Sequence, residues 1–195
     1  TGQGDGFAIT SSEHQVRMLA STEAALLYGV YSLLRMQAAG QVTVPLSVTE
    51  QSVYDLRILN HWDNPDGTVE RGYAGCSLWN WEELPGTLSP RYEAYARANA
   101  SVGINGTVLN NVNASPQVLA TGSLEKVKAL ADVFRPYGIK VYLSVNFASP
   151  IQLGKLDTAD PLDKEVIRWW RRKVKEIYTL IADFGGFLVK ANSEG

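Results

Sequence analysis

The 195-residue sequence contains one cysteine, Cys76, and only two histidines, His14 and His61. A single cysteine cannot form a disulfide within the chain. No two of these three residues lie at the spacing of a zinc site, so we expect no structural zinc and no other bound metal. The glycine-rich start at residues 2–6 resembles half of a dinucleotide fingerprint, but no strand precedes it. We interpret it as a flexible turn and expect no cofactor.

The sequence also lacks a large net charge and long apolar runs. Its formal net charge is -2, whereas nucleic acids and anionic membranes bind strongly basic surfaces. Its apolar stretches are far shorter than the roughly 20 residues of a membrane helix. We therefore expect neither a nucleic acid nor a membrane as a partner. The start shows no basic-then-apolar leader, and both a cytoplasmic and a secreted location stay open.

The first 50 residues predict one strand and one helix. The strand covers 7–10, and the helix begins at Ser21-Thr22-Glu23, which supplies an N-cap hydroxyl and an early acid. Gly40 ends it. An apolar stripe predicts the buried face of the helix: Leu26, Leu27, Val30, Tyr31 and Leu34. Residues 1–50 are therefore interpreted as the end of a small α+β domain, and 45–52 as a linker.

From residue 51 to residue 195 the sequence alternates between strand and helix patterns. Apolar strands are predicted at 56–60, 106–111, 139–145 and 187–189. Helices are predicted to open at Ser89-Pro90, at Ser123 and at Asp160-Pro161. Regular alternation of this kind predicts an α/β fold with a parallel sheet. Four strands make the first half of an eight-stranded (β/α)8 barrel, so we expect 51–195 to be its first four strands.

Each predicted strand ends in polar or aromatic residues. The strand ends read Asn60-His61-Trp62-Asp63, Asn110-Asn111-Val112-Asn113, Asn146-Phe147 and Lys190-Ala191-Asn192-Ser193-Glu194. A barrel builds its active site from these ends. Amides hydrogen-bond to hydroxyl groups and indole rings stack on sugars, so the pattern favours a polyhydroxylated ligand. For any one polar end an exposed loop is the better explanation, but four on one predicted face favour a site.

Glu194 and Lys190 are the residues best suited to chemistry at this edge. A glutamate directly after a buried strand lies in a low-dielectric setting, which favours its protonated form and suits a general acid. Lys190 lies four residues earlier, so it shares a strand face with Glu194 and could bind an anionic substrate group. The alternatives are a solvated loop glutamate and a barrel-lining lysine paired with an acid.

Several long motifs resemble one known family, the α-glucuronidases of glycoside hydrolase family 67. The matching stretches cover 60–64, 69–75, 96–101, 130–138 and 186–195. Residues 1–50 resemble the end of that family's N-terminal domain, an α+β module shared with hexosaminidase-type enzymes. The resemblance extends over the whole chain and is strongest from Tyr54 onward.

The resemblance implies an inverting, metal-free enzyme. Such enzymes release α-1,2-linked 4-O-methyl-D-glucuronic acid from the non-reducing-end xylose of xylo-oligosaccharides. Glu194 matches the family's general acid, Lys190 a ligand of the uronate carboxylate, Trp62 a substrate-binding tryptophan, and Val112 an apolar residue near the 4-O-methyl group. The resemblance implies small aldouronic acids as substrates, and a homodimer is one arrangement open to the whole protein.

The same resemblance predicts that this segment alone is inactive. The family's water-activating carboxylates follow later strands, and an inverting enzyme needs two carboxyl groups. We therefore expect a fragment cut just after one catalytic residue. Two alternatives stay open: a non-catalytic sugar-binding or structural piece, and another barrel glycosidase of the hexosaminidase type. The latter uses an acidic pair after the fourth strand, whereas Asn192-Ser193-Glu194 has one acid.

Overall fold

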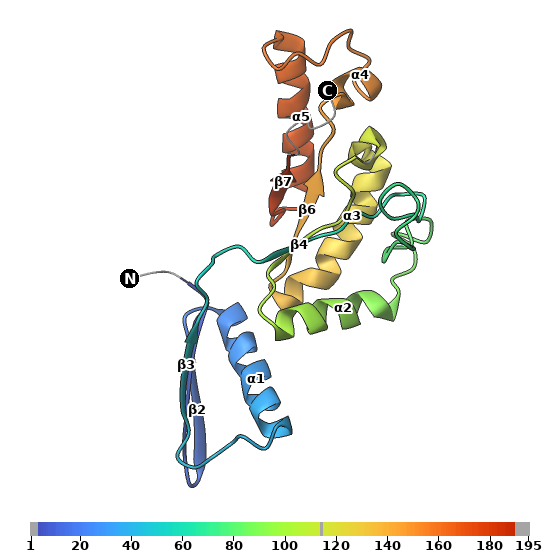
Figure 1. Cartoon of the computed structure of the whole chain (residues 1–195). Coiled ribbons are helices and arrows are strands. Elements are labelled where there is room, and N and C mark those ends of the chain that lie inside the picture. The colour runs from blue at the N-terminus through green and yellow to red at the C-terminus, as the bar shows by residue number, and fades with distance from the viewer. Residues whose placement is uncertain (1–3, 114, 190–195) are drawn as a thin grey trace.

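The computed structural model of the chain describes residues 4–113 and 115–189. An N-terminal module, residues 4–52, contains a three-stranded antiparallel sheet with one helix on one face (Figure 1). Its strands are β1 (Gly6–Ser12), β2 (Gln15–Ala20) and β3 (Ser47–Gln51), in the spatial order β2-β1-β3, and its helix is α1 (Glu23–Ala38). Strands β2 and β3 were not predicted from the sequence.

The predicted linker at 45–52 is wrong, because Ser47–Gln51 forms β3 and pairs antiparallel with β1. The sequence interpretation also missed β2, which pairs with the other edge of β1. Both strands are mostly exposed, so neither shows the apolar run that marks a buried strand. The alternation of Val16 and Met18 with polar neighbours was the available signal for β2.

Helix α1 begins where predicted, with the Thr22 hydroxyl accepting from the Ala25 amide, but its buried face differs from the predicted stripe. The face against the sheet carries Tyr28 and Gly29, and a Cβ at Gly29 would lie 2.8 Å from the Met18 sulfur. A side chain at this position would force Met18 and the Phe7 ring to shift, so glycine suits this close approach of helix and sheet. Of the predicted stripe, Leu27 and Tyr31 pack against the larger core, whereas three residues are exposed: Leu26, Val30 and Leu34.

The second part of the chain forms a four-stranded parallel sheet in sequence order, β4-β5-β6-β7. The strands are β4 (Ile58–Asn60), β5 (Gly106–Val108), β6 (Lys140–Ser144) and β7 (Gly186–Leu188), and the long helices are α2 (Pro90–Ser101), α3 (Thr121–Phe134) and α5 (Lys164–Leu180). Three short helical turns complete this part: η1 (Pro116–Leu119), η2 (Arg135–Tyr137) and α4 (Ser149–Gln152). The predicted parallel alternation of strand and helix is confirmed, and the fold is mixed α/β.

The helix starts are partly as predicted. Ser89 caps α2 by accepting from the Arg91 amide. Helix α3, however, begins two residues before Ser123, after Ala120, which provides no side-chain cap. Helix α5 begins after Asp163, whose carboxylate accepts from two backbone amides, rather than at Asp160-Pro161. Asp160 instead accepts from the Leu162 amide and closes the turn before the helix.

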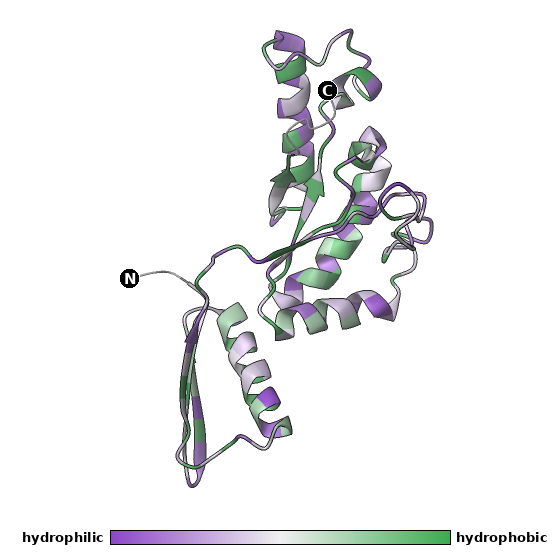
Figure 2. Cartoon of the chain, in the orientation of Figure 1, coloured by the Kyte–Doolittle hydropathy of each residue, from purple (hydrophilic) through white to green (hydrophobic). Residues whose placement is uncertain are grey.

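Most of the tryptophans lie in the core rather than at a ligand site. Trp79 is 1% exposed, packs on Tyr92 and Phe134, and donates its indole N–H to the Leu109 carbonyl at 3.0 Å. Trp81 and Trp169 are also buried. Figure 2 shows that α5 carries both hydrophilic and hydrophobic residues, and its buried residues are Val166, Trp169 and Ile177. Among the described residues, none of the helices combines the length and apolar character needed to cross a membrane.

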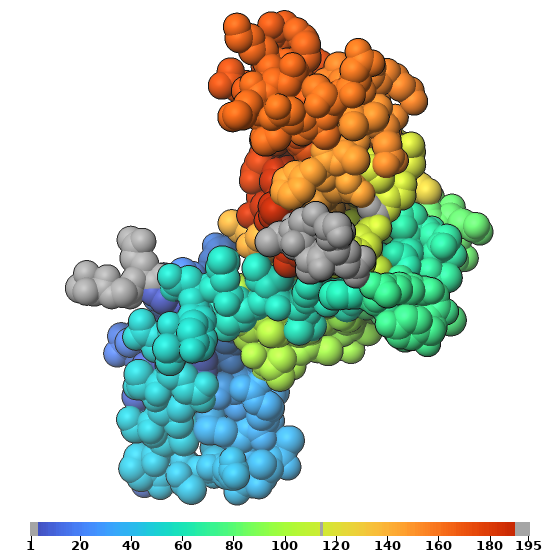
Figure 3. All heavy atoms as spheres, turned by 45° about the horizontal axis from the view of Figure 1, so that its top comes forward, coloured from blue at the N-terminus to red at the C-terminus, as the bar shows by residue number. Residues whose placement is uncertain are grey.

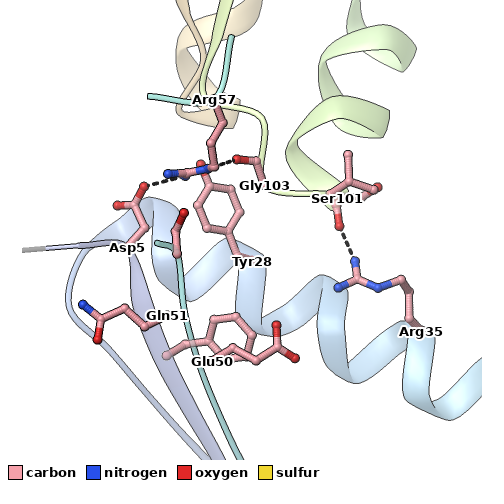
Figure 4. Close-up of a pocket in the computed structure, with 11 residues that line it drawn as sticks. Asp5, Tyr28, Arg35, Glu50, Gln51, Arg57, Ser101 and Gly103 are labelled. Atoms are coloured by element: carbon pink, nitrogen blue, oxygen red, sulfur yellow. Dashed lines mark hydrogen bonds and ion pairs between the residues drawn. The ribbon is translucent and has the colours of Figure 1, made fainter. Parts of the chain in front are cut away.

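The N-terminal module forms its own lobe, in blue to cyan in Figure 3, and Arg57 ties it to the rest. The Arg57 guanidinium donates to Asp5 Oδ2 at 2.8 Å and to the carbonyl of Gly103 at 2.5 Å. It also donates to the Tyr54 carbonyl at 2.6 Å and lies 5.6 Å from the centroid of the Tyr28 ring (Figure 4). One side chain thus joins the residue before β1, helix α1, the connecting segment and the turn after α2.

We expect Arg57→Ala to loosen this junction. The substitution removes the guanidinium's hydrogen bonds to the Asp5 carboxylate and to the carbonyls of Gly103 and Tyr54. Hydrogen bonds to a charged group contribute about 1.5–3 kcal/mol each when partly buried. Hydrogen exchange of the segment 51–60 in the full-length protein should become at least tenfold faster. Arg168→Ala is the matched control, because Arg168 and its partner Glu165 are both more than half exposed and such pairs contribute little. Equal exchange in the two variants would contradict this role of Arg57.

Candidate active site

The C-terminal ends of the four parallel strands lie along one edge of the sheet, which is where a site was predicted. Trp62 follows β4 and Val112 follows β5, and Asn146 and Phe147 follow β6. Because β4 and β5 are neighbours in register, with Asn60 opposite Val108, the structure brings Trp62 and Val112 to the same edge. Lys190 and Glu194 follow β7 in the sequence but lie outside the described residues.

Backbone hydrogen bonds join the segments that carry Trp62 and Val112. The Asp63 carbonyl accepts from the Asn111 amide at 2.8 Å, and the Trp62 carbonyl accepts from the Glu70 amide at 2.9 Å. Trp62 itself is 37% exposed and Val112 is half-buried. A tryptophan held at its backbone and open on one side can stack on a flat apolar surface such as a sugar ring.

Two of the asparagines at this edge have structural roles, which corrects the expectation that they bind ligand hydroxyls. Asn110 is fully buried, and its side chain accepts from the Ser144 amide at 2.8 Å and donates to the Ser144 carbonyl at 3.0 Å. Its amide group thereby extends the pairing of β5 with β6. Asn111 is also buried and donates to the Glu70 carbonyl at 3.0 Å. Asn60 and Phe147 remain exposed at the edge.

The loop 63–80 contains features that the sequence interpretation treated only as a long connection. Glu70 has a φ of 59°, a conformation that non-glycine residues rarely adopt. Three hydrogen bonds hold it there: its amide donates to Trp62, and its carbonyl accepts from the side chains of Asn64 and Asn111. The turn signal Asn64-Pro65-Asp66-Gly67 could have predicted a compact loop here.

Asp63 anchors the far end of this loop. Its side chain is 5% exposed, and its Oδ2 accepts from the Ser77 hydroxyl at 2.7 Å and from the Leu78 amide at 2.6 Å. The carboxylate is therefore used to close the loop rather than to face a ligand. Since the donors of these hydrogen bonds lie 14 and 15 positions away in the sequence, no local sequence pattern predicts them.

No candidate metal centre lies at this edge in the described part of the chain. No group of three or more His, Cys, Asp or Glu side chains there could hold a metal ion. A hollow of about 400 Å³ does exist at the junction of the two parts, lined by Asp5, Tyr28, Glu50 and Arg57 among others (Figure 4). Its lining includes neither Trp62 nor Val112, so it is separate from the candidate site.

Solved structures similar to this chain share its fold at low sequence identity. The structure of CpGH84B superposes with a TM-score of 0.62 and 12% identity, covering 96% of this chain and 30% of that one. The crystal structure of a beta-N-acetylhexosaminidase superposes with a TM-score of 0.54 and 15% identity, covering 91% of this chain and 45% of that one. At these identities the likeness concerns the fold alone.

Comparison with related sequences is more specific than the likeness in fold. The chain is 44% identical over 192 residues to a probable alpha-glucuronidase A of Aspergillus clavatus, and 42% identical over 196 residues to alpha-glucuronidase A of Emericella nidulans. Both alignments cover 98% of this chain and 23% of the relative, so the chain spans about a quarter of their length. Residues 36–195 match the profile of the glycosyl hydrolase family 67 middle domain. The chain belongs to glycosyl hydrolase family 67.

Proposed function

We propose that this chain is part of an inverting α-glucuronidase. The full-length enzyme would release α-1,2-linked D-glucuronic acid or its 4-O-methyl ether from the terminal xylose of xylo-oligosaccharides. The observation that carries the proposal is the family match over residues 36–195, together with 44% identity to a probable alpha-glucuronidase A. The exposed tryptophan at the carboxyl edge of the parallel sheet supports it.

The proposal includes a domain assignment. Residues 1–50 form the C-terminal part of an α+β N-terminal domain, and 51–195 supply the first four strands of a (β/α)8 barrel. Four parallel strands in sequence order, with helices between them, support this assignment. In such a barrel the ligand lies at the carboxyl ends of the strands, which is the edge that Trp62 and Val112 occupy.

Four residues have proposed roles in the reaction. Trp62 stacks on the substrate, and Val112 forms an apolar wall beside the 4-O-methyl group. Lys190 binds the uronate carboxylate by a charge-assisted hydrogen bond, and Glu194 protonates the xylosyl leaving group. The exposure of Trp62 and the apolar side chain of Val112 at the same edge support the first two roles. The catalytic base lies on a part of the enzyme outside this sequence, so the segment alone should be inactive.

A hexosaminidase activity is the alternative that the fold likeness raises. The solved hexosaminidase is only 15% identical to this chain. Similarity at that level indicates a shared fold but does not indicate a shared substrate. The test is hydrolysis of a purified aldouronic acid by the full-length protein, with an aryl N-acetyl-β-hexosaminide as the comparison substrate. Free uronic acid from the first and no reaction with the second is the expected result. The opposite preference would overturn the proposal.

A further inference from the structure

Trp62 lies between two polar residues, the half-buried His61 and the buried Asp63. His61 lies against Tyr95 of α2, on the helix-covered face of the sheet. Trp62, two residues past the end of β4, is 37% exposed. A rigid group on the covered face can thus hold the backbone from which the tryptophan projects.

His61 is fixed by contacts on several sides. Its Nε2 lies 2.5 Å from the Tyr95 hydroxyl, and its Nδ1 lies 3.8 Å from Asp63 Oδ1. The ring also packs edge-on against the buried Trp79, with centroids 5.4 Å apart. The Tyr95 hydroxyl lies a further 3.3 Å from the Thr107 hydroxyl of β5. The imidazole therefore connects the end of β4 to α2 and, through Tyr95, to β5.

The chemistry of these groups selects one form of the imidazole. Burial lowers the pKa of His61 and the nearby Asp63 charge opposes this only in part, so the ring is neutral near pH 7. Burial also raises the pKa of Tyr95, which keeps its hydroxyl protonated and able to donate. Nε2 then accepts from Tyr95, and the ring proton resides on Nδ1, facing the Asp63 carboxylate.

The backbone on both sides of Trp62 is held by neighbouring segments. The His61 amide donates to the Val108 carbonyl at 3.1 Å, and Asp63 accepts from the Asn111 amide. With the side chains of 61 and 63 also fixed, residue 62 has little freedom to move. Tyr95 on α2 and His61 after β4 are thereby linked to the orientation of the exposed Trp62 ring.

We propose that His61 is a positioning residue for Trp62, acting as a neutral bridge between Tyr95 and Asp63. This inference rests on the proposed function, because it assigns Trp62 a place against the substrate. None of the three bridging side chains touches the sugar. Their effect is to hold the tryptophan in the orientation that stacks on it, and small displacements of a binding group can lower activity by up to about a hundredfold.

The first test compares Tyr95→Phe with Tyr92→Phe in the full-length enzyme. Both tyrosines are on α2, and each variant keeps its ring. Tyr92→Phe loses the hydrogen bond from the Asn80 amide at 2.8 Å, whereas Tyr95→Phe loses the contacts with His61 and Thr107. We expect Tyr95→Phe to raise KM for an aldouronic acid about tenfold with kcat little changed, since stacking acts on bound substrate and transition state alike. Tyr92→Phe should leave KM within a factor of two. Equal KM values in the two variants would overturn the proposal.

The second test replaces His61 itself and needs no activity. Gln places its terminal amide near the former Nε2 and can still accept from Tyr95, whereas Ala cannot. Crystal structures of the full-length variants should show the Trp62 ring displaced in His61→Ala and retained in His61→Gln. An unmoved ring in His61→Ala would overturn the inference even in an active enzyme. Failure of the wild type to release uronic acid would instead overturn the proposed function and leave this structural comparison decisive for the positioning role.

Discussion

In the full-length enzyme, Glu194→Gln should nearly abolish release of glucuronic acid from natural xylo-oligosaccharides while sparing much of the activity on an aryl glucuronide. Glutamine keeps the size and shape of the side chain but has no acidic proton. A xylosyl alkoxide is a poor leaving group and needs that proton as the glycosidic bond breaks, whereas a nitrophenolate leaves without it. General acid catalysis contributes about 10²–10⁴-fold, so kcat on the natural substrate should fall by at least that range.

The pair of substrates is the control for this prediction. A variant that is merely misfolded or that binds sugar poorly loses activity on both substrates to a similar extent. Measuring kcat and KM for each substrate separates these cases. Equal losses on the xylo-oligosaccharide and on the aryl glucuronide would reject Glu194 as the acid and move that role to another carboxylate.

Lys190→Ala should weaken binding of both substrates by a similar factor. The lysine is proposed to contact the uronate carboxylate, which is present in the natural and in the aryl substrate alike. A hydrogen bond to a charged group is worth about 1.5–3 kcal/mol, and each 1.4 kcal/mol is a factor of ten. We therefore expect KM to rise about 10- to 100-fold for each, with kcat changed much less than in Glu194→Gln.

Lys190→Arg is the matched variant, because it retains a cation at the same position. It should recover part of the lost affinity, although a guanidinium differs from an ammonium in geometry. A substrate analogue without the carboxylate, an α-glucoside with the same leaving group, should be insensitive to Lys190→Ala. If Lys190→Ala raises KM for that analogue as much as for the uronate substrates, Lys190 does not recognise the carboxylate.

The parts of the fold that local sequence encodes were predicted well. The strand-helix alternation predicted the parallel order β4-β5-β6-β7, and the Ser89-Pro90 pair marked the start of α2. Strand β3 was missed because its pairing with β1 joins residues about 40 positions apart and its side chains are largely exposed. Such pairing depends on the assembled sheet rather than on a local pattern.

Helix α1 shows how a correct pattern can predict the wrong face. Three residues of the predicted stripe are exposed, namely Leu26, Val30 and Leu34. The sheet instead takes the side with Tyr28 and Gly29, where Met18 and the Phe7 ring come close to Gly29. At that contact Gly29 lets the helix lie close to the sheet, beside the buried Tyr28. The sequence alone does not say which of two apolar faces meets the sheet.

The strand-end pattern predicted an edge of the sheet as the place of the site, but not the contacts that several residues at that edge make. The strand-end rule correctly brought Trp62 and Val112 to one edge of the sheet. It did not predict that the Asn110 side chain would hydrogen-bond to the backbone of Ser144. Nor did it predict the contact between His61 and Tyr95, which lie 34 residues apart in the sequence. The first of these contacts links β5 to β6 and the second links the end of β4 to α2, and no motif in the sequence describes either.

The most direct test of the central claim is the configuration of the uronic acid that the full-length enzyme first releases from an aldouronic acid. Proton NMR, recorded faster than the sugar mutarotates, distinguishes the two anomers. An inverting enzyme acting on an α-linkage must deliver water to the opposite face of the ring, so the account predicts that the β-anomer appears first. Initial appearance of the α-anomer, or no release of uronic acid at all, would contradict it.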